Sequence, residues 1–215
     1  MQTGKDKENA RNMERVAVID FETTGLSPAQ GDRATEIAAV IVDDGRVVDR
    51  YQSLMNAGRR VPAHIEALTG ISTAMVRRAP PAAEVMQAVS DFVGELPLVA
   101  HNAAFDAKFW DAELARVQRT RKQDFVCSLL LSRRLLPLAP SHKLGALVQY
   151  AQLPVAGRYH RAQADAEMAA SLLLHLEQEL RLRHRLPRVS VELLRRIQRA
   201  SKAQLPKCLL AAQAA

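Results

Sequence analysis

Two acidic side chains follow an apolar stretch near the start of the chain. Asp20 and Glu22 stand two residues apart in VAVIDFETTG (residues 16–25), directly before the turn signal Thr-Thr-Gly. Side chains two residues apart in a strand point to the same face, so both carboxylates would meet at one place. Close like charges raise each other's pKa, and a divalent cation such as Mg²⁺ or Mn²⁺ relieves that repulsion. The pair therefore predicts a metal site with further acids. The alternative is a solvated strand end.

More acids and a histidine occur later in the chain. HNAAFD (residues 101–106) ends in Asp106, and HRAQADAE (residues 160–167) contains His160 and Asp165. Each acid falls in the first turn of a predicted helix, where the helix dipole favours a carboxylate. Either acid alone has an ordinary explanation as a helix-start residue. Strand ends and helix starts gather at one edge of an open sheet, however, so we expect one cluster of four acids and His160.

The three segments resemble a known set of motifs. DFETTG, HNAAFD and the five-residue spacing from His160 to Asp165 are similar, in this order, to the motifs of the DEDDh (DnaQ-like) 3′–5′ exonuclease superfamily. That superfamily includes the proofreading epsilon subunit of bacterial DNA polymerase III. The resemblance covers about residues 15–180, and IEALTGIS (65–72) resembles the family's substrate-side motif. It implies an α/β, ribonuclease H-like fold, in which helices flank a five-stranded mixed sheet whose second strand is antiparallel.

The resemblance also implies a role for each motif residue. Two divalent cations, Mg²⁺ or Mn²⁺, would be held by Asp20, Glu22 and Asp165, with Asp106 completing the cluster. His160 would deprotonate the attacking water. The substrate-binding residues implied in the same way are Thr23, Leu26, Leu68, Thr69, Asn102 and Phe105. For the two leucines and the phenylalanine of that set, ordinary core packing is the alternative.

Hydrophobic patterning predicts the elements that position these residues. Strands are predicted over residues 16–20, 35–43, 46–53, 98–101 and 125–127, the first three as a meander with a hairpin turn at Asp44-Gly45. Helices are predicted over residues 80–95, 103–117, 128–136, 143–151, 163–186 and 191–203, with short helical turns within 61–76. We therefore expect a flexible N-terminus (1–14), an exonuclease domain (15–186) and a basic helical tail (187–215).

The positive charge of the chain gathers in that tail. The net charge is +7, and residues 181–215 carry nine Lys and Arg side chains against one acid, so the remainder is close to neutral. An uneven basic charge favours an anionic partner such as nucleic acid. The expected partner is a single-stranded 3′ end. The tail could instead bind a DNA polymerase subunit or pack on the core.

The motifs leave the substrate open. Nothing in them separates DNA from RNA, so an RNA 3′-end trimming enzyme is an alternative to a DNA exonuclease. A non-catalytic module that binds nucleic acid or a polymerase is a second alternative. No apolar run is long enough to span a membrane, and the polar N-terminus lacks a secretory signal. With two cysteines, too few for a disulfide framework, these features predict a cytoplasmic protein.

Overall fold

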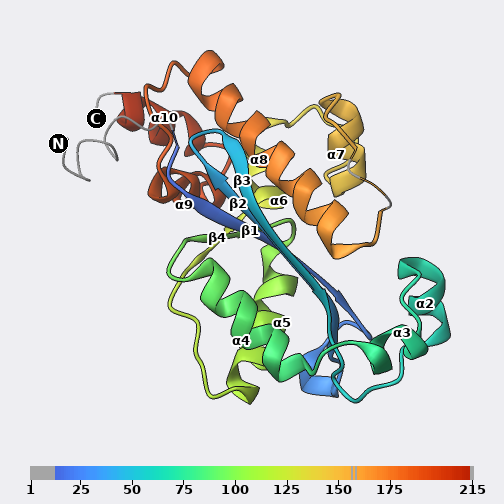
Figure 1. Ribbon diagram of the computed structural model, residues 1–215. Coiled ribbons are helices and arrows are strands. Elements are labelled where there is room, and N and C mark those ends of the chain that lie inside the picture. Colours follow the sequence, from blue (N-terminus) through green and yellow to red (C-terminus); the bar gives the residue numbers. More distant parts are fainter. Residues whose placement is uncertain (1–12, 156, 158, 214–215) are drawn as a thin grey trace.

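A five-stranded mixed sheet forms the centre of the protein (Figure 1). The computed structural model describes residues 13–155, 157 and 159–213. The strands are β1 Val16–Thr23, β2 Ala34–Asp43, β3 Arg46–Leu54, β4 Leu98–Ala100 and β5 Phe125–Cys127. Their spatial order is β3-β2-β1-β4-β5, in which β2 runs antiparallel to β1 and β3, and β4 runs parallel to β1 and β5. The predicted meander and mixed sheet are confirmed.

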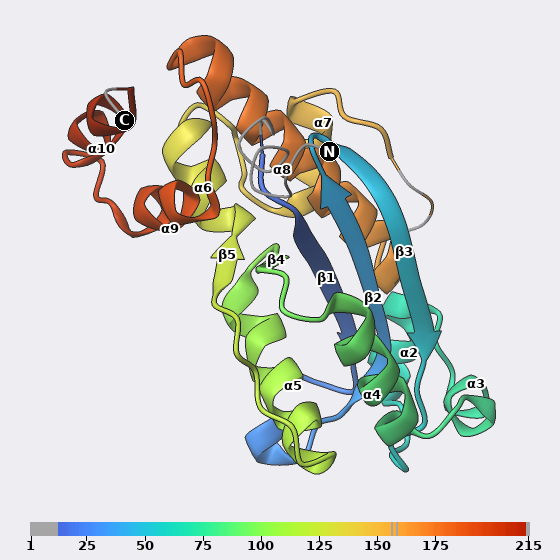
Figure 2. The ribbon, with the colours of Figure 1, turned by 60° about the vertical axis from the view of Figure 1, so that its left-hand side comes forward.

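Helices cover both faces of this sheet (Figure 2). They are η1 Pro28–Gln30, α2 Ala63–Thr69, α3 Thr73–Arg78, α4 Ala82–Val93, α5 Ala103–Arg116, α6 Ser128–Leu135, α7 Leu144–Tyr150, α8 Ala162–Arg183, α9 Val191–Arg199 and α10 Leu205–Gln213. α4 and α5 pack on one face and α8 on the other, with α6 beside α8. None of the helices in the described part of the chain has the length and apolar character needed to cross a bilayer.

The side chains of β1 alternate between the two faces. Three of them pack with α4 and α5: Ala17, Ile19 and Phe21. Val16 and Val18 pack with α8 on the opposite face. Because residues two apart share a face, Asp20 and Glu22 also point to the α8 side. The period-two argument made from the sequence therefore places both acids correctly.

β1 is longer than the sequence predicted. The predicted strand ended at Asp20, whereas β1 continues to Thr23 because β2 pairs with it along its whole length. Glu22 stands directly opposite Glu36 of β2 in this ladder. Both acids therefore lie inside the strand, where hydrogen bonds to β2 hold the backbone. The sequence analysis had placed Asp20 at the end of the strand and Glu22 beyond it.

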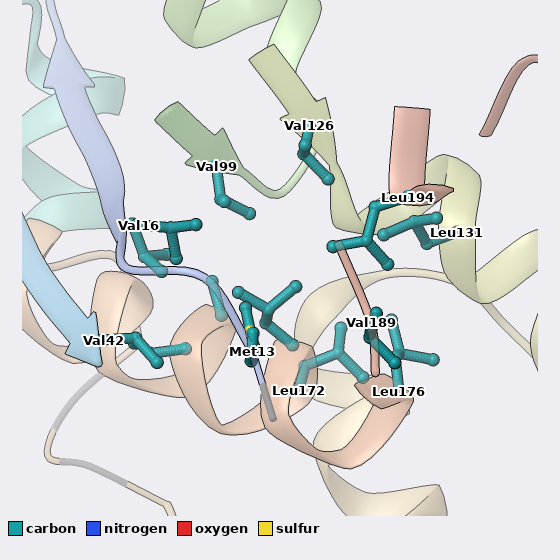
Figure 3. Close-up of a cluster of buried hydrophobic side chains, with 14 of the residues drawn as sticks. Met13, Val16, Val42, Val99, Val126, Leu131, Leu172, Leu176, Val189 and Leu194 are labelled. Carbon is teal, nitrogen blue, oxygen red and sulfur yellow. The ribbon is translucent and has the colours of Figure 1, made fainter. Parts of the chain in front are cut away.

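The tail packs against the core. α9 buries its apolar side, with Leu193, Leu194 and Ile197 at most 5% exposed. In Figure 3, Leu194 lies in the same cluster as Val126 of β5 and Leu131 of α6. Packing was one of the three alternatives for the tail. The helix predicted over 191–203 ends at 199, and a second helix, α10, follows that the sequence did not predict.

The side chain of Gln198 covers an edge of the sheet. Its Oε1 accepts the backbone N–H of Cys127 at 2.7 Å, and its Nε2 donates to the carbonyl of Phe125 at 3.3 Å. Both groups belong to β5, which is the outermost strand on that side. The amide therefore satisfies the backbone groups that an exposed edge would offer to another chain.

A flexible N-terminal segment was predicted over residues 1–14. Residues 1–12 of it lie outside the described part of the chain. Met13 is fully buried and forms a bridge with Val189, which precedes α9. The start of the described chain and the segment before α9 thus belong to the same hydrophobic cluster (Figure 3).

Deleting residues 187–215 should destabilise the protein. Each buried aliphatic side chain contributes about 1.5–3 kcal/mol, so loss of α9 should lower the free energy of unfolding by at least ~3 kcal/mol and Tm by roughly 6–12 °C. Thermal unfolding followed by circular dichroism tests this. Deletion of residues 205–215 alone is the control, because α10 buries only Leu209 among its described residues. Equal Tm values for the full chain and the longer deletion would contradict the packing described above.

Candidate active site

The end of β4 leaves room for an acid beside β1. β4 pairs with β1 at Ala17 and Val18, whereas β2 continues to pair as far as Thr23. Beyond β4, the backbone N–H of Phe21 donates to Oδ1 of Asp106 at 3.2 Å. Asp106 comes from the first turn of α5 and is 1% exposed. The carboxylate of Asp106 thus occupies the position that a longer β4 would take beside β1. This brings Asp106 next to the strand that carries Asp20 and Glu22.

On the α8 side, two of the predicted acids meet the predicted histidine. Ligand atoms of Glu22, His160 and Asp165 lie within 4.8 Å of one another. Asp165 is in the first turn of α8, and its Oδ2 accepts the backbone N–H of His160 at 2.8 Å. His160 lies just before the helix with φ of 61° and an exposed side chain. The base predicted from the sequence therefore stands beside two of the predicted ligands.

Burial and mutual repulsion disfavour ionisation of these acids. Burial raises the pKa of Asp20 well above its ordinary value, and the charges of Asp106, Asp165 and Glu22 raise it further. Burial, followed by the charge of Asp165, raises the pKa of Glu22 to about 8. Burial also raises the pKa of Asp106 to about 7, and that of Asp165 above its ordinary value. The four acids form one electrostatic cluster.

This set of groups fits a divalent cation. Carboxylate oxygens and one imidazole converge from β1, α5 and the start of α8, and hard cations prefer oxygen ligands of this kind. The raised pKa values are the cost of holding the acids together without a positive charge. A cation would lower them again, so the chemistry of the site favours one.

A cavity of about 930 Å³ adjoins the cluster. Asp20, His160 and Asp165 are part of its lining, together with residues of α6, α7 and their connecting loop and of the segment between β4 and α5. Two exposed cations that the sequence analysis did not single out, Arg133 and Lys143, are also in its wall. The acids could hold cations at the cavity, and Arg133 and Lys143 place positive charge in its wall. This arrangement suits a ligand made of successive phosphodiesters, because each of these is negatively charged.

His101 supports the wall of this cavity. Its Nδ1 lies 3.0 Å from Oγ of Ser128, and its Nε2 lies 3.0 Å from the carbonyl oxygen of His142. Burial lowers the pKa of His101 to about 4, so the ring is neutral near pH 7. The next residue, Asn102, is exposed to the cavity with φ of 70°, which is consistent with its predicted role.

The predicted substrate-binding residues divide into exposed and packed groups. Leu26 is 77% exposed and Leu68 is 48% exposed, so core packing does not explain either. Phe105 is partly buried against Phe109, with ring centroids 5.1 Å apart, as the packing alternative expects. Thr69 is buried and donates its hydroxyl hydrogen to the carbonyl of the residue four positions earlier at 2.9 Å.

Thr23 and its neighbours form a rigid loop that presents Leu26. The hydroxyl of Thr23 donates to the carbonyl of Gly25 at 2.6 Å. Asp32 accepts the hydroxyl of Thr24 at 3.2 Å and the backbone N–H of residue 27 at 3.0 Å. A Cβ on Gly25 would lie 2.4 Å from Asp32, so only glycine fits there. The loop is thereby fixed although its leucine faces solvent.

The sequence analysis also missed the ion pair between Glu36, which is buried, and Arg161, which is partly exposed. Glu36 is an isolated acid in an otherwise apolar strand, TEIAAVIV. That isolation was the available signal, because a charge is buried in a central strand only when it has a partner.

Comparisons with known proteins identify the family of this chain. A family model described as "Exonuclease" (RNase_T) matches residues 17–173. The chain is 35% identical over 187 residues to "3'-5' exonuclease DinG" of Bacillus subtilis, covering 86% of this chain and 20% of that protein. It is 38% identical over 164 residues to "DNA polymerase III PolC-type" of Oceanobacillus iheyensis, covering 76% of this chain and 11% of that protein. The chain thus spans one fifth or less of the length of these relatives.

Solved structures give the same result. Exonuclease X, in complex with 5′ overhanging duplex DNA, has a TM-score of 0.61 and 30% identity, covering 76% of this chain and 91% of that one. The nuclease domain of 3'hExo, a DEDDh family member bound to rAMP, has a TM-score of 0.65 at 19% identity, covering 77% and 92%. The likeness confirms the ribonuclease H-like fold. From its motifs, its fold and these matches, the chain belongs to the DnaQ-like DEDDh family of 3′–5′ exonucleases.

Proposed function

We propose that this protein hydrolyses phosphodiester bonds one at a time from the 3′ ends of DNA or RNA and releases nucleoside 5′-monophosphates. The convergence of Glu22, His160 and Asp165, whose ligand atoms lie within 4.8 Å of one another beside a large cavity, carries this proposal. Membership of the exonuclease family supports it.

Members of the family use divalent metal ions. We infer that two, Mg²⁺ or Mn²⁺, are held here by Asp20, Glu22 and Asp165, with Asp106 completing the cluster. When bound, they would neutralise these carboxylates and stabilise the charge that develops on the scissile phosphate.

His160 is the proposed general base. Histidine is the side chain that most often acts as a general base, which suits the removal of a proton from the attacking water. Its side chain is exposed at the cavity, where it can reach water, and Asp165 holds its backbone N–H. The proton therefore passes from the water to the ring and then to solvent.

Two exposed leucines would receive the terminal nucleotide. We propose that Leu26 wedges against the last base and that Leu68 and Thr69 line the nucleotide pocket. The backbone near Thr23 would meet the 3′-hydroxyl, while Asn102 and Phe105 would lie near the incoming strand. The loop around Gly25 supports this assignment. It already holds the exposed, bulky side chain of Leu26 in place, so binding a nucleotide would cost little conformational entropy.

A DNA polymerase subunit is the proposed protein partner of the tail. The exposed side of α9 carries Glu192, Arg196 and Arg199, while its other side is buried. The matches to PolC-type DNA polymerases support such a partner. Co-purification with a polymerase, weakened by Arg196→Glu together with Arg199→Glu, tests it.

A gel assay tests the proposed reaction. A 5′-labelled single strand of DNA, and the matched RNA, should give a ladder that shortens from the 3′ end with Mg²⁺ or Mn²⁺ and not with EDTA. The faster ladder identifies the preferred nucleic acid. Strand binding without any ladder would instead favour a non-catalytic module.

His160→Ala should slow hydrolysis by about 10²–10⁴-fold, the usual contribution of a positioned general base. The rate of single-turnover cleavage at saturating protein measures this effect. His175→Ala is the matched control, because His175 is in the same helix as Asp165 but lines a different hollow. Equal rates for both variants would remove His160 from the mechanism.

A further inference from the structure

We propose that the ion pair between buried Glu36 and partly exposed Arg161 positions His160, and that it acts as a tertiary cap which fixes the start of α8. The inference rests on the proposed function, since it assigns a positioning role within the same site. Glu36 lies outside the three sequence motifs, and Arg161 lies inside the third without a predicted role of its own. Neither residue lines the cavity beside the acids.

Glu36 is fully satisfied although it is completely buried. Its side chain is 0% exposed in the middle of the sheet, on the strand opposite Glu22. Oε1 accepts from Nη2 of Arg161 at 2.7 Å and from the amide of Gln52 at 2.6 Å. Oε2 accepts from Nε of Arg161 at 3.0 Å and from the backbone N–H of Ala162 at 3.0 Å. The two-pronged geometry fixes both the position and the orientation of the guanidinium.

The bond to Ala162 makes Glu36 the cap of α8. The first N–H groups of a helix have no partner within the helix, and a side chain near the N-cap normally accepts one of them. At α8 the N-cap residue is Arg161, whose side chain makes no capping bond. A carboxylate from β2 takes over that task, and its negative charge also complements the helix dipole. The start of α8 is therefore tied to the central sheet.

His160 directly precedes this anchor and depends on it. Its φ of 61° is uncommon for a residue other than glycine, so surrounding contacts must hold it there. Asp165 accepts its backbone N–H, and Asp165 in turn donates its own N–H to the carbonyl of Arg161 at 3.0 Å. Loosening Arg161 would thus release both ends of the turn that presents the imidazole.

The protein contains a matched control for this pair. Glu113 is 2% exposed, accepts two bonds from Arg33 at 2.7 and 2.8 Å, and also accepts the backbone N–H of Ala34 at 3.3 Å. Like the first pair, it joins a buried glutamate to a partly exposed arginine through two hydrogen bonds, with one backbone donor. It joins α5 to the loop before β2, and neither of its members is a proposed catalytic group.

The experiment compares Glu36→Gln with Glu113→Gln on the full chain. Both should lower Tm to a similar extent, because each removes a buried carboxylate charge and leaves an arginine without its ion-pair partner. Single-turnover cleavage, measured at saturating protein well below both Tm values, should fall about 10–100-fold for Glu36→Gln alone, the effect of a misplaced reacting group. Glu113→Gln should keep the wild-type rate at saturation. Arg161→Lys should fall between wild type and Glu36→Gln, because lysine keeps the charge without the fork.

Two readouts separate positioning from loss of structure. If Glu36 acts through His160, Glu36→Gln should slow the His160→Ala variant little further, whereas independent effects would multiply. Hydrogen exchange of the metal-free protein should accelerate over residues 159–166 in Glu36→Gln and not in Glu113→Gln. If Glu36→Gln does not fold, Glu36→Gln with Arg161→Met removes both charges and takes its place.

The outcomes are distinct. Multiplying effects, or equal loss of rate in the two glutamine variants, would overturn the positioning role while leaving the proposed reaction intact. A wild-type protein without metal-dependent cleavage would overturn the proposed function instead. In that case unchanged exchange over residues 159–166 would also overturn the anchoring role.

Discussion

Asp20→Asn should abolish hydrolysis and, in the absence of metal, make the protein more stable. Burial and the charges of four neighbouring carboxylates raise the pKa of Asp20, so this acid contributes repulsion to the folded state. The neutral amide of the same shape removes that repulsion and a metal ligand together. We expect cleavage to fall by at least about 10³-fold, the scale of losing one preorganised electrostatic group in an active site. The Tm measured in EDTA near pH 8 should rise by a few degrees.

The opposite directions of these two effects make the prediction specific. A variant that lost activity because its fold was damaged would melt earlier, not later. Asp124→Asn is the control, because Asp124 is exposed and distant in sequence from the motifs, and it should change neither quantity. An Asp20→Asn protein that retains metal-dependent cleavage would show that Asp20 is not required to hold the metal ions.

Divalent cations should stabilise the protein strongly at pH 8 and weakly at pH 5. Burial and neighbouring charge raise the pKa of Glu22 from 4.5 to about 8 and burial raises that of Asp106 from 3.8 to about 7. Between those ordinary and raised values the folded state binds more protons than the unfolded state, so stability without metal falls as the pH rises from about 4 to 8. A cation replaces the protons. At 100 times its Kd it should raise Tm by roughly 5–10 °C.

Differential scanning fluorimetry at pH 5 and pH 8, with EDTA, Mg²⁺ or Mn²⁺, measures this effect. Glu22→Gln should flatten the fall of Tm with pH in EDTA and should reduce the gain from metal. A protein whose Tm in EDTA rose between pH 5 and pH 8 would contradict the sign of the shifts. An equal gain from metal in Glu22→Gln would place the cation elsewhere.

The acid cluster was predictable because each of its members has a local signal. Asp20 and Glu22 are two apart in an apolar strand, and Asp106 and Asp165 are placed at helix starts. The end of β1 was not predictable to the residue, because the pairing of β2, and not the local pattern, decides where the strand stops.

Other features depended on contacts between distant segments. The role of Glu36 became evident only when the fold brought Arg161 to it across more than 100 residues of sequence. α10 was missed because its stretch, LPKCLLAAQ, has a weak apolar side and a proline in its first turn. For α9 the apolar side was visible from the sequence, and so was the strand over 125–127, but the hydrogen bonds from Gln198 to that strand were not.

The shortness of β4 limits how this protein can tolerate insertions. β4 has three residues, and the N–H of Phe21 beyond it is taken by Asp106. Two further residues in β4 would offer their own carbonyl oxygen to that N–H and expel the carboxylate. The sheet would gain hydrogen bonds and lose a member of its acid cluster. We therefore expect changes in chain length to be accepted far more readily in the loop between α5 and β5 than between residues 98 and 106, where a longer strand would displace Asp106.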